Sequence, residues 1–449
     1  MSNIIGQIVI GHRLRQRYQI PSEDTATVRV GCRFVTSKMT FSEGNDYILS
    51  PDLTRALYLS KGHKLRFRYD SGARMIHLGP TVGILATSLP NRLNPSPTSV
   101  QAELVYLSQL GKTLRGQVFV FTPSGIDWQS QTVRGYNYKQ GASSERGVWT
   151  AAIYPLPDVV YDRVPSRRRE AQPIITETKR KLLATAHVKY FNPAFLNKWQ
   201  VYQVLSQNPS LSLHLPETRL LNPAQLEAML EKYAVLFLKP CNGSLGKGII
   251  YVKKSKNQKL QYIAYPGGRI KGTSDTAGDL LERTATVRKG RPYLVQEGLD
   301  LAKYNGSAFD IRIIYQKNGW GEWQTGKKFA RIAPHGSNIS NLSSGGSFEK
   351  MKRLMNRLYR RETRRKKYAL IKELCKTVAL TLESHSQGIY GELGLDIGMG
   401  KNGIPYLIEV NSKPRKTTHS LVSQDVVAKT FRRPLEFACY LAGFPQKKP

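Results

Sequence analysis

Two carboxylates and an amide near the C-terminus could together hold a hard cation. They are Asp396, Glu409 and Asn411, within the stretch "GELGLDIGMGKNGIPYLIEVNSKP". The turn-forming residues 401–403 predict a hairpin, and Glu409 and Asn411 share a face because they lie two apart on one strand. Carboxylate and amide oxygens are the ligands that Mg²⁺ accepts beside nucleotide phosphates. Structural salt bridging is the alternative interpretation.

A glycine-rich loop supplies a candidate site for phosphate. In "VLFLKPCNGSLGKGIIYVKK", Gly243, Gly246, Lys247 and Gly248 form a short turn between two aliphatic runs. A Walker A loop would need a glycine in the place of Cys241 and a helix after the lysine. The aliphatic runs instead predict strands, so the loop caps a hairpin, and its backbone N–H groups could fold over a phosphate chain. An ordinary hairpin turn without a ligand is the alternative.

Further charged residues lie on two other predicted strands. In "FDIRIIY", Asp310 and Arg312 alternate along one strand and therefore point into the same cleft, although a surface ion pair would show the same pattern. Arg331 ends another strand, and a long polar loop follows, with Asn341 and two glycines at 345–346. Polar glycine-rich loops of this length are usually mobile linkers or functional lids.

Composition limits the class of protein. The 449 residues predict about two to three domains, and the 40% hydrophobic content is enough for buried cores. No apolar run approaches the ~18–20 residues of a membrane span. We expect no signal peptide, because the N-terminus lacks a basic start and a small-residue cleavage site. The four cysteines form no C-x-x-C pair, which favours reduced thiols in a cytosolic compartment over a zinc site.

Basic residues outnumber acidic residues by 68 to 32, which gives a formal net charge of +36. Such a field favours polyanions such as nucleic acid, anionic lipid or acidic polymers. The densest basic run, residues 351–385, has apolar residues at mostly helical spacing, which predicts one or two helices with a solvated arginine face. A dedicated nucleic-acid surface is the alternative, but no recognisable nucleic-acid module accompanies the charge.

The elements that must position these residues fall into four segments. Residues 1–79 read as short strands and turns, and residues 80–165 alternate strand, helix and strand, which suggests a small parallel sheet. The charged residues 166–185 look like a linker. Residues 186–445 form the largest unit, and the cation, glycine-loop and arginine motifs all lie within it.

The order of the motifs resembles the ATP-grasp superfamily, and more narrowly the YheC/YheD-type endospore coat-associated family. The motifs that carry the resemblance cover most of the chain and are, in order, "LSPDL", "LGPTVGILAT", "YDRVPSR", "FNPAFLNKW", "LPETR", "KPCNGSLGKGI", "QEGL", "FDIR", "NLSSGG" and "IEVNSKP". The resemblance implies an α/β (α+β) ATP-grasp fold for residues 186–445. It also implies a small Rossmann-like domain in residues 80–165 and a strand-rich N-terminal segment in residues 1–79.

The resemblance further implies which residues bind ATP. Lys198 and Lys239 would contact phosphates, residues 243–248 would form a flap over the triphosphate, and residues 297–299 would be the hinge for adenine. Asp310 would hold the ribose hydroxyls. The full set of implied nucleotide-binding residues is Lys198, Lys239, Gly243, Ser244, Gly246, Lys247, Gly248, Gln296, Glu297, Gly298, Leu299 and Asp310.

Catalytic and metal-binding roles are implied in the same way. The catalytic residues would be Arg312, Arg331 and Asn341, with the two arginines stabilising the transferred phosphoryl group or the acyl phosphate. The metal ligands of two bridging Mg²⁺ ions would be Asp396, Glu409 and Asn411. Where family members commonly have a glycine after the next proline, this chain has Arg415, which leaves the ligands intact. Arg415 either limits how closely a substrate approaches beneath that turn or indicates an anionic substrate.

The function that the resemblance implies is an ATP- and Mg-dependent ligase. It would join a small carboxylate or peptide to an amine, or to a thiol, through an acyl phosphate, and it could be linked to endospore coat formation. We expect a cytoplasmic protein that could associate with the spore coat, and its basic surface could bind spore-coat or other anionic partners. Three alternatives stay open: a kinase on the same scaffold, a non-catalytic nucleotide-binding coat protein, and a nucleic-acid-binding protein.

Overall fold

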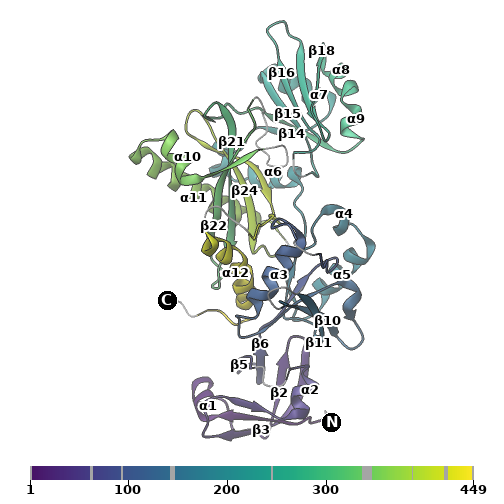
Figure 1. Ribbon diagram of the computed structural model, residues 1–449, viewed down its shortest axis with the longest axis vertical. Helices are drawn as coiled ribbons and strands as arrows, with labels where there is room; N and C mark the ends of the chain where they lie inside the picture. Colours follow the sequence, from purple (N-terminus) through teal and green to yellow (C-terminus); the bar gives the residue numbers. More distant parts are fainter. Residues whose placement is uncertain are drawn as a thin grey trace.

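The computed structural model describes residues 3–60, 64–92, 95–141, 147–243, 246–335, 346–386, 388–418 and 423–446. Within these residues the strands form four sheets, which follow one another along the long axis of the molecule (Figure 1). The N-terminal sheet lies at one end and the sheet that contains the glycine hairpin lies at the other. The architecture is a mixture of helices and sheets, as the sequence predicts.

The first sheet contains the strand-rich N-terminal segment. Its strands, in sheet order, are β4 (Tyr47–Leu49), β1 (Gln7–Gly11), β3 (Arg33–Ser42), β2 (Thr25–Val30), β6 (Met75–Gly79) and β5 (Arg66–Asp70). Alternating side chains such as Ile8, Ile10 and Val28 are fully buried, so the sheet has a core of its own, to which α1 (His12–Tyr18) and α2 (Pro51–Ala56) contribute.

The second sheet confirms the predicted parallel strands and adds strands that the sequence did not predict. In sheet order it contains β11 (Val148–Pro155), β10 (Thr132–Lys139), β8 (Gln117–Phe121), β7 (Thr81–Leu85), β12 (Val159–Asp162) and β13 (Lys189–Phe191), with β9 (Ile126–Asp127) paired to β10. The neighbouring strands β8, β7, β12 and β13 pair in parallel, and α3 (Val100–Gly111) connects β7 to β8. The β10–β11 hairpin is antiparallel and polar, and its mixed composition gave no clear strand signal.

The charged segment 166–185 is helical rather than an extended connection. It forms α4 (Arg167–Glu170) and α5 (Pro173–Ala184). Ile175 and Leu182 are buried in a core shared with the second sheet, and Lys179 lies one helical turn from each on the same buried face. Arg168, Arg169 and Arg180 are exposed on the outer face of these helices, whereas Lys179 is buried.

The third sheet is antiparallel and holds the glycine-rich loop. Its strands, in sheet order, are β14 (Thr218–Leu220), β19 (Tyr293–Glu297), β15 (Val235–Pro240), β16 (Ile249–Lys254), β17 (Leu260–Tyr265) and β18 (Ile270–Ser274). Helices α7 (Pro223–Lys232), α8 (Ala277–Arg283) and α9 (Ala285–Arg288) lie against it. Since β15 and β16 pair antiparallel, the loop between them caps a hairpin, which confirms that part of the sequence prediction.

The fourth sheet is also antiparallel and holds the predicted cation ligands. Its strands, in sheet order, are β23 (Ser347–Lys350), β22 (Trp323–Ile332), β21 (Ser307–Lys317), β24 (Glu392–Met399) and β25 (Pro405–Asn411), with β20 (Lys303–Tyr304) paired to β21. The predicted C-terminal hairpin is β24–β25. Helix α6 (Lys198–Ser206) lies between this sheet and the third sheet, where it contacts both β14 and β25.

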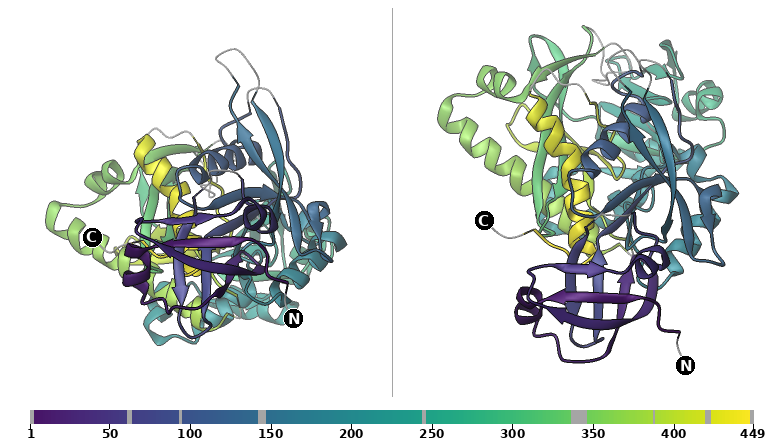
Figure 2. Two further views of the ribbon diagram at one scale, coloured as in Figure 1. Left: turned by 90° about the horizontal axis from the view of Figure 1, so that it is seen from below. Right: turned by 60° about the horizontal axis from the view of Figure 1, so that its bottom comes forward.

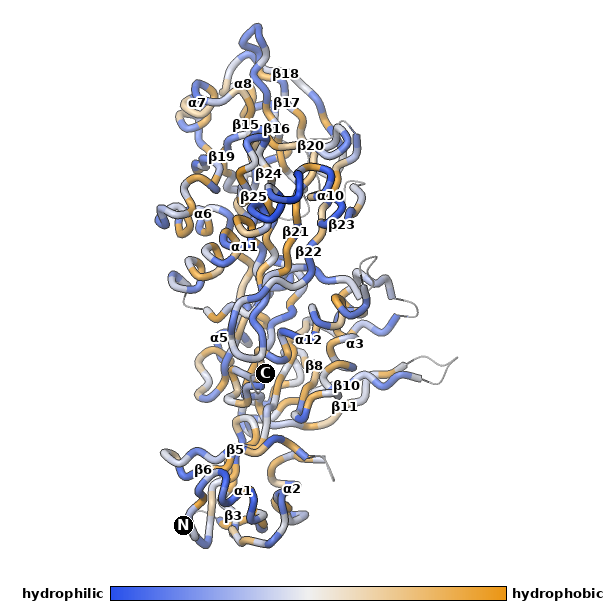
Figure 3. Tube along the Cα trace, turned by 90° about the vertical axis from the view of Figure 1, so that its left-hand side faces the viewer, coloured by the Kyte–Doolittle hydropathy of each residue, from blue (hydrophilic) through white to orange (hydrophobic). Residues whose placement is uncertain are grey.

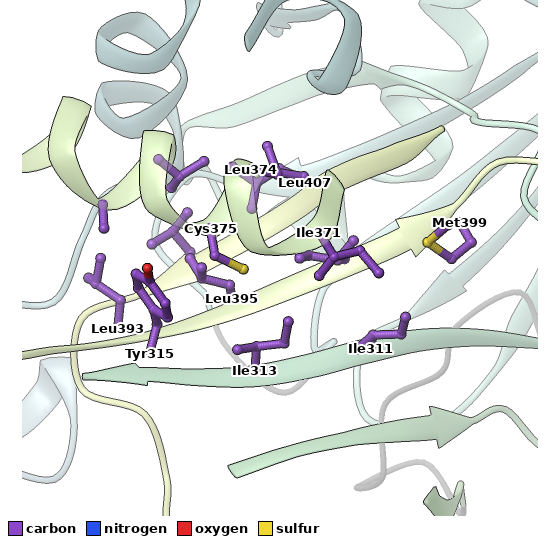
Figure 4. Close-up of a cluster of buried hydrophobic side chains, with 14 of the residues drawn as sticks. Ile311, Ile313, Tyr315, Ile371, Leu374, Cys375, Leu393, Leu395, Met399 and Leu407 are labelled. Atoms are coloured by element: carbon purple, nitrogen blue, oxygen red, sulfur yellow. The ribbon is translucent and has the colours of Figure 1, made fainter. Parts of the chain in front are cut away.

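Two basic helices cover the fourth sheet, as the periodicity predicts. They are α10 (Met351–Leu358) and α11 (Arg361–Ser384). Ile371 and Leu374 of α11 pack on Ile313 and Leu395 of the strands beneath (Figure 4). Hydrophilic residues dominate α10 and the start of α11 in Figure 3, and Arg365 is exposed, so the arginines line a solvated face.

The last helix joins the fourth sheet to the second. Helix α12 (Gln424–Leu441) contacts β21 and β22 on one side and α3 and β12 on the other, and Figure 2 shows it between these parts of the molecule. The four cysteines are free and buried. None of the helices in the described ranges is both long and apolar enough to cross a membrane.

Candidate active site

Lys239 and Gln296 meet on neighbouring strands of the third sheet. Lys239 Nζ donates a hydrogen bond to Gln296 Oε1, and Gln296 Nε2 donates to Thr218 Oγ1 over 2.8 Å. Burial lowers the pKa of Lys239 to about 8, while the nearby carboxylate of Glu409 opposes this shift. Because its partner in the structure is a neutral amide, Lys239 could form an ion pair with an anion such as phosphate.

Lys198 connects the glycine-rich loop to the fourth sheet. It is the first residue of α6, whose start is fixed by Asn197, since the Asn197 side-chain oxygen accepts from the backbone N–H groups of the next two helix positions. Lys198 Nζ donates to the carbonyl oxygen of Gly243 over 2.7 Å and pairs with Glu409 Oε1 at 3.1 Å. A single cation therefore bridges the loop and β25.

These groups line one cavity between the third and fourth sheets, with a volume of about 50 Å³. Its polar side chains are Lys198, Tyr202, Thr218, Lys239, Gln296 and Glu409, and its remaining wall is mostly aliphatic. Two cations in apolar surroundings attract an anion more strongly than they would in water, because the local dielectric constant is low. The two lysines therefore favour an anionic group beside an aliphatic wall.

Asp396 lies opposite Glu409, in register across the β24–β25 hairpin. Arg312 of β21 makes a two-point contact with the Asp396 carboxylate, through Nε to Oδ1 and through Nη2 to Oδ2 at 2.9 Å. Arg331 Nη2 approaches Asp396 Oδ2 at 2.8 Å. Burial alone would raise the pKa of Asp396, but the two guanidinium groups hold it below its ordinary value. The carboxylate is thus ionised although it is buried.

Asp310 and Arg312 face the same way, as the alternation predicts, but each pairs with a residue of another strand. Arg331 contacts Asp310 Oδ1 through Nε at 2.7 Å and through Nη2 at 2.6 Å. Asp310 is only 3% exposed. The result is a charge ladder, Arg312–Asp396–Arg331–Asp310, across three strands. The ribose role of Asp310 stays a prediction, and its carboxylate is already held by Arg331.

The proposed adenine hinge has most of its backbone donors in use. The N–H of Glu297 donates to the carbonyl of Glu217 over 2.9 Å, and the N–H of Gly298 donates to the carbonyl of Val235 over 2.9 Å. In the described part of the chain, the N–H of Leu299 makes no hydrogen bond. Among these three donors, Leu299 is the one left for a purine nitrogen.

The glycine-rich loop is described in part. Gly246 and Gly248 have φ angles of +73° and +81°, in the region that glycine adopts without strain, and Gly248 N–H donates to the carbonyl of Tyr265 over 2.7 Å. Lys247 is exposed at the turn. Ser244 of this loop and Asn341 of the long polar loop lie outside the described residues.

The donor set fits a hard cation by its chemistry. Asp396 and Glu409 are carboxylates in register on neighbouring strands, and Asn411 follows on the same strand as Glu409, paired in register with Gly394. Both oxygens of Asp396 already contact Arg312 or Arg331. Within the residues that the structure describes, no group of three or more His, Cys, Asp or Glu could hold a metal. A cation at Asp396 and Glu409 therefore needs the Asn411 amide and oxygens from a ligand to complete its shell.

Sequence reasoning did not single out a second group of charges, around Glu392 at the start of β24. Glu392 is fully buried, and Arg163 Nη1 and Lys416 Nζ contact its carboxylate at 2.9 Å and 3.0 Å. Lys413 pairs with other carboxylates, those of Asp162 and Glu170. The lysines in "NSKPRK", directly after Asn411, were the one local signal that this region is charged.

The two antiparallel sheets, with a glycine hairpin on one and facing carboxylates on the other, place the chain in the ATP-grasp class. A model of the family described as YheC/D like ATP-grasp matches residues 187–441, and the chain belongs to this family.

Two relatives agree with this assignment. The chain is 28% identical over 410 residues to endospore coat-associated protein YheD of Bacillus subtilis (strain 168), an alignment that covers 88% of this chain and 85% of YheD. It is 27% identical over 363 residues to endospore coat-associated protein YheC of the same organism, covering 78% of this chain and 96% of YheC. The crystal structure of D-alanyl-alanine synthetase A from Vibrio cholerae aligns with a TM-score of 0.45 and 15% identity, over 82% of this chain and 98% of that chain. At this TM-score the likeness adds nothing to the family match.

Proposed function

We propose that the protein is an ATP-dependent ligase that joins a carboxylate to an amine. The observation that carries the proposal is the shared cavity: Lys198, Lys239 and Glu409 line one space, and Asp396 faces Glu409 across the hairpin. Lys239 of the third sheet and Lys198 of α6 supply positive charge for the phosphates of a nucleotide. The carboxylates of the fourth sheet supply ligands for its counter-ions.

The chain's own residues would hold ATP in three parts. Lys198 and Lys239 bind the phosphates, and the backbone of Leu299 binds adenine. Asp396, Glu409 and Asn411 would hold two Mg²⁺ ions, which would supply positive charge to offset that of the phosphates.

Bond formation would follow in two steps. A carboxylate oxygen of the first substrate attacks the γ-phosphorus of ATP, forming an O–P bond while the bond to ADP breaks. Arg312 and Arg331 offset the negative charge that develops on the transferred phosphoryl group. The nitrogen of an amine then attacks the acyl carbon, the C–N bond forms, phosphate leaves, and the amine proton passes to solvent. A thiol would give a thioester by the same route.

We also propose that this ligase is associated with the endospore coat. The support is that two curated relatives, YheD and YheC of Bacillus subtilis, carry that association in their names. The exposed basic face of α10 and α11 offers a surface for anionic coat components.

The test is ADP release by the purified full-length protein with Mg-ATP, across a panel of carboxylates with and without amines. We expect release to require a carboxylate, and added hydroxylamine to capture the acyl group as a hydroxamate. A kinase would instead need a hydroxyl acceptor and would yield no hydroxamate. Tight Mg-ATP binding with no ADP release across the panel would refute the ligase and favour a non-catalytic protein.

A further inference from the structure

A second cavity, of about 290 Å³, lies between the start of α3 and the segment that follows β25. Val100 of α3, Arg163 after β12, and Lys413, Arg415 and Lys416 after β25 all line it. These residues come from three parts of the chain that are far apart in sequence. The cavity therefore exists only because the second and fourth sheets lie together.

Most of the basic residues that line this cavity are already neutralised. Lys416 Nζ pairs with Glu392 Oε2 at 3.0 Å, and Arg163 pairs with Glu392 Oε1 at 2.9 Å and with Glu103 Oε1 at 2.6 Å. The charge that these residues lend to a ligand is small, because it is balanced by neighbouring carboxylates. They form rigid polar walls.

Lys413 is neutralised in the same way. Its Nζ lies 2.7 Å from Asp162 Oδ1 and 2.7 Å from Glu170 Oε1, and its side chain is 2% exposed. The lysine is therefore fixed between two carboxylates and belongs to the wall of the cavity.

Within the part of the chain that the structure describes, three donors of the cavity have no hydrogen-bond or ion-pair partner. Arg415 is exposed and, in the described ranges, makes no ion pair. Arg163 is 8% exposed, yet its buried Nε has no hydrogen-bond partner among the described residues. The N–H of Val100, in the first turn of the 12-residue helix α3, makes no hydrogen bond within the described residues, and the helix dipole favours an anion there. All three donors belong to residues that line the cavity.

The cavity adjoins the reaction centre on the far side of Pro414. Gly394 of β24 is the pairing partner of Asn411, and a Cβ at Gly394 would lie 2.9 Å from Pro414 Cβ and 3.3 Å from Arg312 Nη1. The carbonyl of Pro414 accepts from Arg163 Nη2 over 3.4 Å. One glycine thus separates Arg312 from the loop that carries Arg415.

We propose that this cavity binds the amine acceptor of the ligase through a carboxylate of its own, so that the acceptor is an amino acid or a short peptide with a free carboxyl group. This inference rests on the proposed ligase function. The carboxylate held here is not the one that is activated, because Arg415 lies beyond Pro414 from Arg312.

The test is a calorimetric titration of the full chain, loaded with Mg²⁺ and a non-hydrolysable ATP analogue. The probes are glycine, L-alanine, L-glutamate and diglycine, each beside its carboxamide, which differs by the loss of one charge. We expect at least one free acid to bind, and its carboxamide to bind at least about tenfold more weakly. Arg415→Ala should weaken the acid by about tenfold and Arg415→Glu by more, while Arg357→Ala, an exposed arginine of α10, should have no effect.

Equal binding of acids and carboxamides, no binding by any probe, or wild-type affinity in Arg415→Glu would each overturn the proposal. ADP release separates its failure from failure of the ligase. If carboxamides promote ADP release as well as the acids do, the ligase stands and this site falls. If acids bind through Arg415 but nothing releases ADP, the site stands and the ligase falls.

Discussion

The two cavities use charge in opposite ways. The cavity between the third and fourth sheets has few charged groups, and these have few partners: Lys239 contacts a neutral amide, and Lys198 contacts one carboxylate and one carbonyl. The cavity beside α3 is lined by more cations, but each of its buried lysines is held by carboxylates, as Lys416 is by Glu392.

The ion-paired side chains of the first cavity are also more exposed to solvent than those of the second. The side chains of Lys198 and Glu409 are 17% and 25% exposed, whereas Glu392 is fully buried. Removing a partly exposed charge leaves its partner in contact with water, while removing a buried one leaves an unpaired charge in a low-dielectric interior. We therefore expect substitutions in the first cavity to reduce activity and substitutions in the walls of the second to reduce stability.

The largest expected effect on stability is that of Glu392→Gln. The substitution keeps the shape of the side chain but leaves Arg163 and Lys416 buried without their shared carboxylate. Breaking a buried ion pair in this way costs about 3–5 kcal/mol. Chemical denaturation followed by circular dichroism measures the loss.

Glu362→Gln is the matched control, because Glu362 is exposed at the start of α11 and makes no ion pair within the described residues. Its unfolding free energy should stay within about 0.5 kcal/mol of the wild type. If the two variants unfold at the same denaturant concentration, the walls of the second cavity are not the stabilising network that the comparison requires.

Glu409→Gln should have the opposite profile. We expect ADP release to fall by about 10²–10³-fold, because one charged group that faces the phosphates is lost. The melting temperature should change little, since Lys198 keeps its hydrogen bond to Gly243. Coupled-enzyme assay and thermal denaturation of the same preparation supply both numbers.

Glu282→Gln, on the exposed face of α8, controls for the loss of one negative charge and should retain wild-type ADP release. Wild-type turnover by Glu409→Gln would remove Glu409 from the site. A large fall in melting temperature would show that Glu409, like Glu392, is structural, and the contrast between the cavities would disappear.

The sequence predicts the first cavity better than the second for a physical reason. Lys239, Glu409 and Asn411 sit on short strands next to turns, and strand alternation places their side chains from local pattern alone. Arg163 and Glu392 are separated by 229 positions, and nothing near either residue indicates that they meet. Their contact follows from the packing of two sheets, which no local pattern contains.

The same limit explains the differences in the fold. Helices α5 and α11 both carry many basic residues, but the apolar stripe of α11 is long enough to be recognised, whereas the stripe of α5 rests on Ile175 and Leu182. The antiparallel β10–β11 hairpin has half-buried and exposed positions on both strands, so its alternation is weak. Helices and strands with a strong local hydrophobic pattern were predicted, and those with a weak pattern were missed.

A smaller effect is expected from the pH dependence of nucleotide binding at Lys239. Burial lowers its pKa to about 8, so the ammonium that attracts phosphate is present below that pH and is lost as pH rises through it. If binding requires the charged form, affinity for Mg-ATP should fall about tenfold between roughly pH 7 and 9. Titration with a fluorescent ATP analogue across this range measures the change.

Lys239→Arg sharpens this prediction, since a guanidinium stays protonated throughout the range. Its affinity should be nearly independent of pH, whereas Lys239→Gln should bind weakly at every pH. An unchanged affinity between pH 7 and 9 in the wild-type protein would show that Lys239 does not contribute its charge to nucleotide binding.

The smallest expected effect is that of Arg415→Ala on stability. This variant tests whether Arg415 is available to contact a ligand or is a structural part of the wall of the second cavity. Arg415 is exposed and unpaired in the described ranges, so its loss should change the unfolding free energy by no more than about 0.5 kcal/mol. Lys416→Ala, one position along, should cost about 3–5 kcal/mol, because Lys416 is 1% exposed and pairs with Glu392. Equal losses in the two variants would make Arg415 part of the wall, and the cavity would then have no free cation with which to hold a carboxylate.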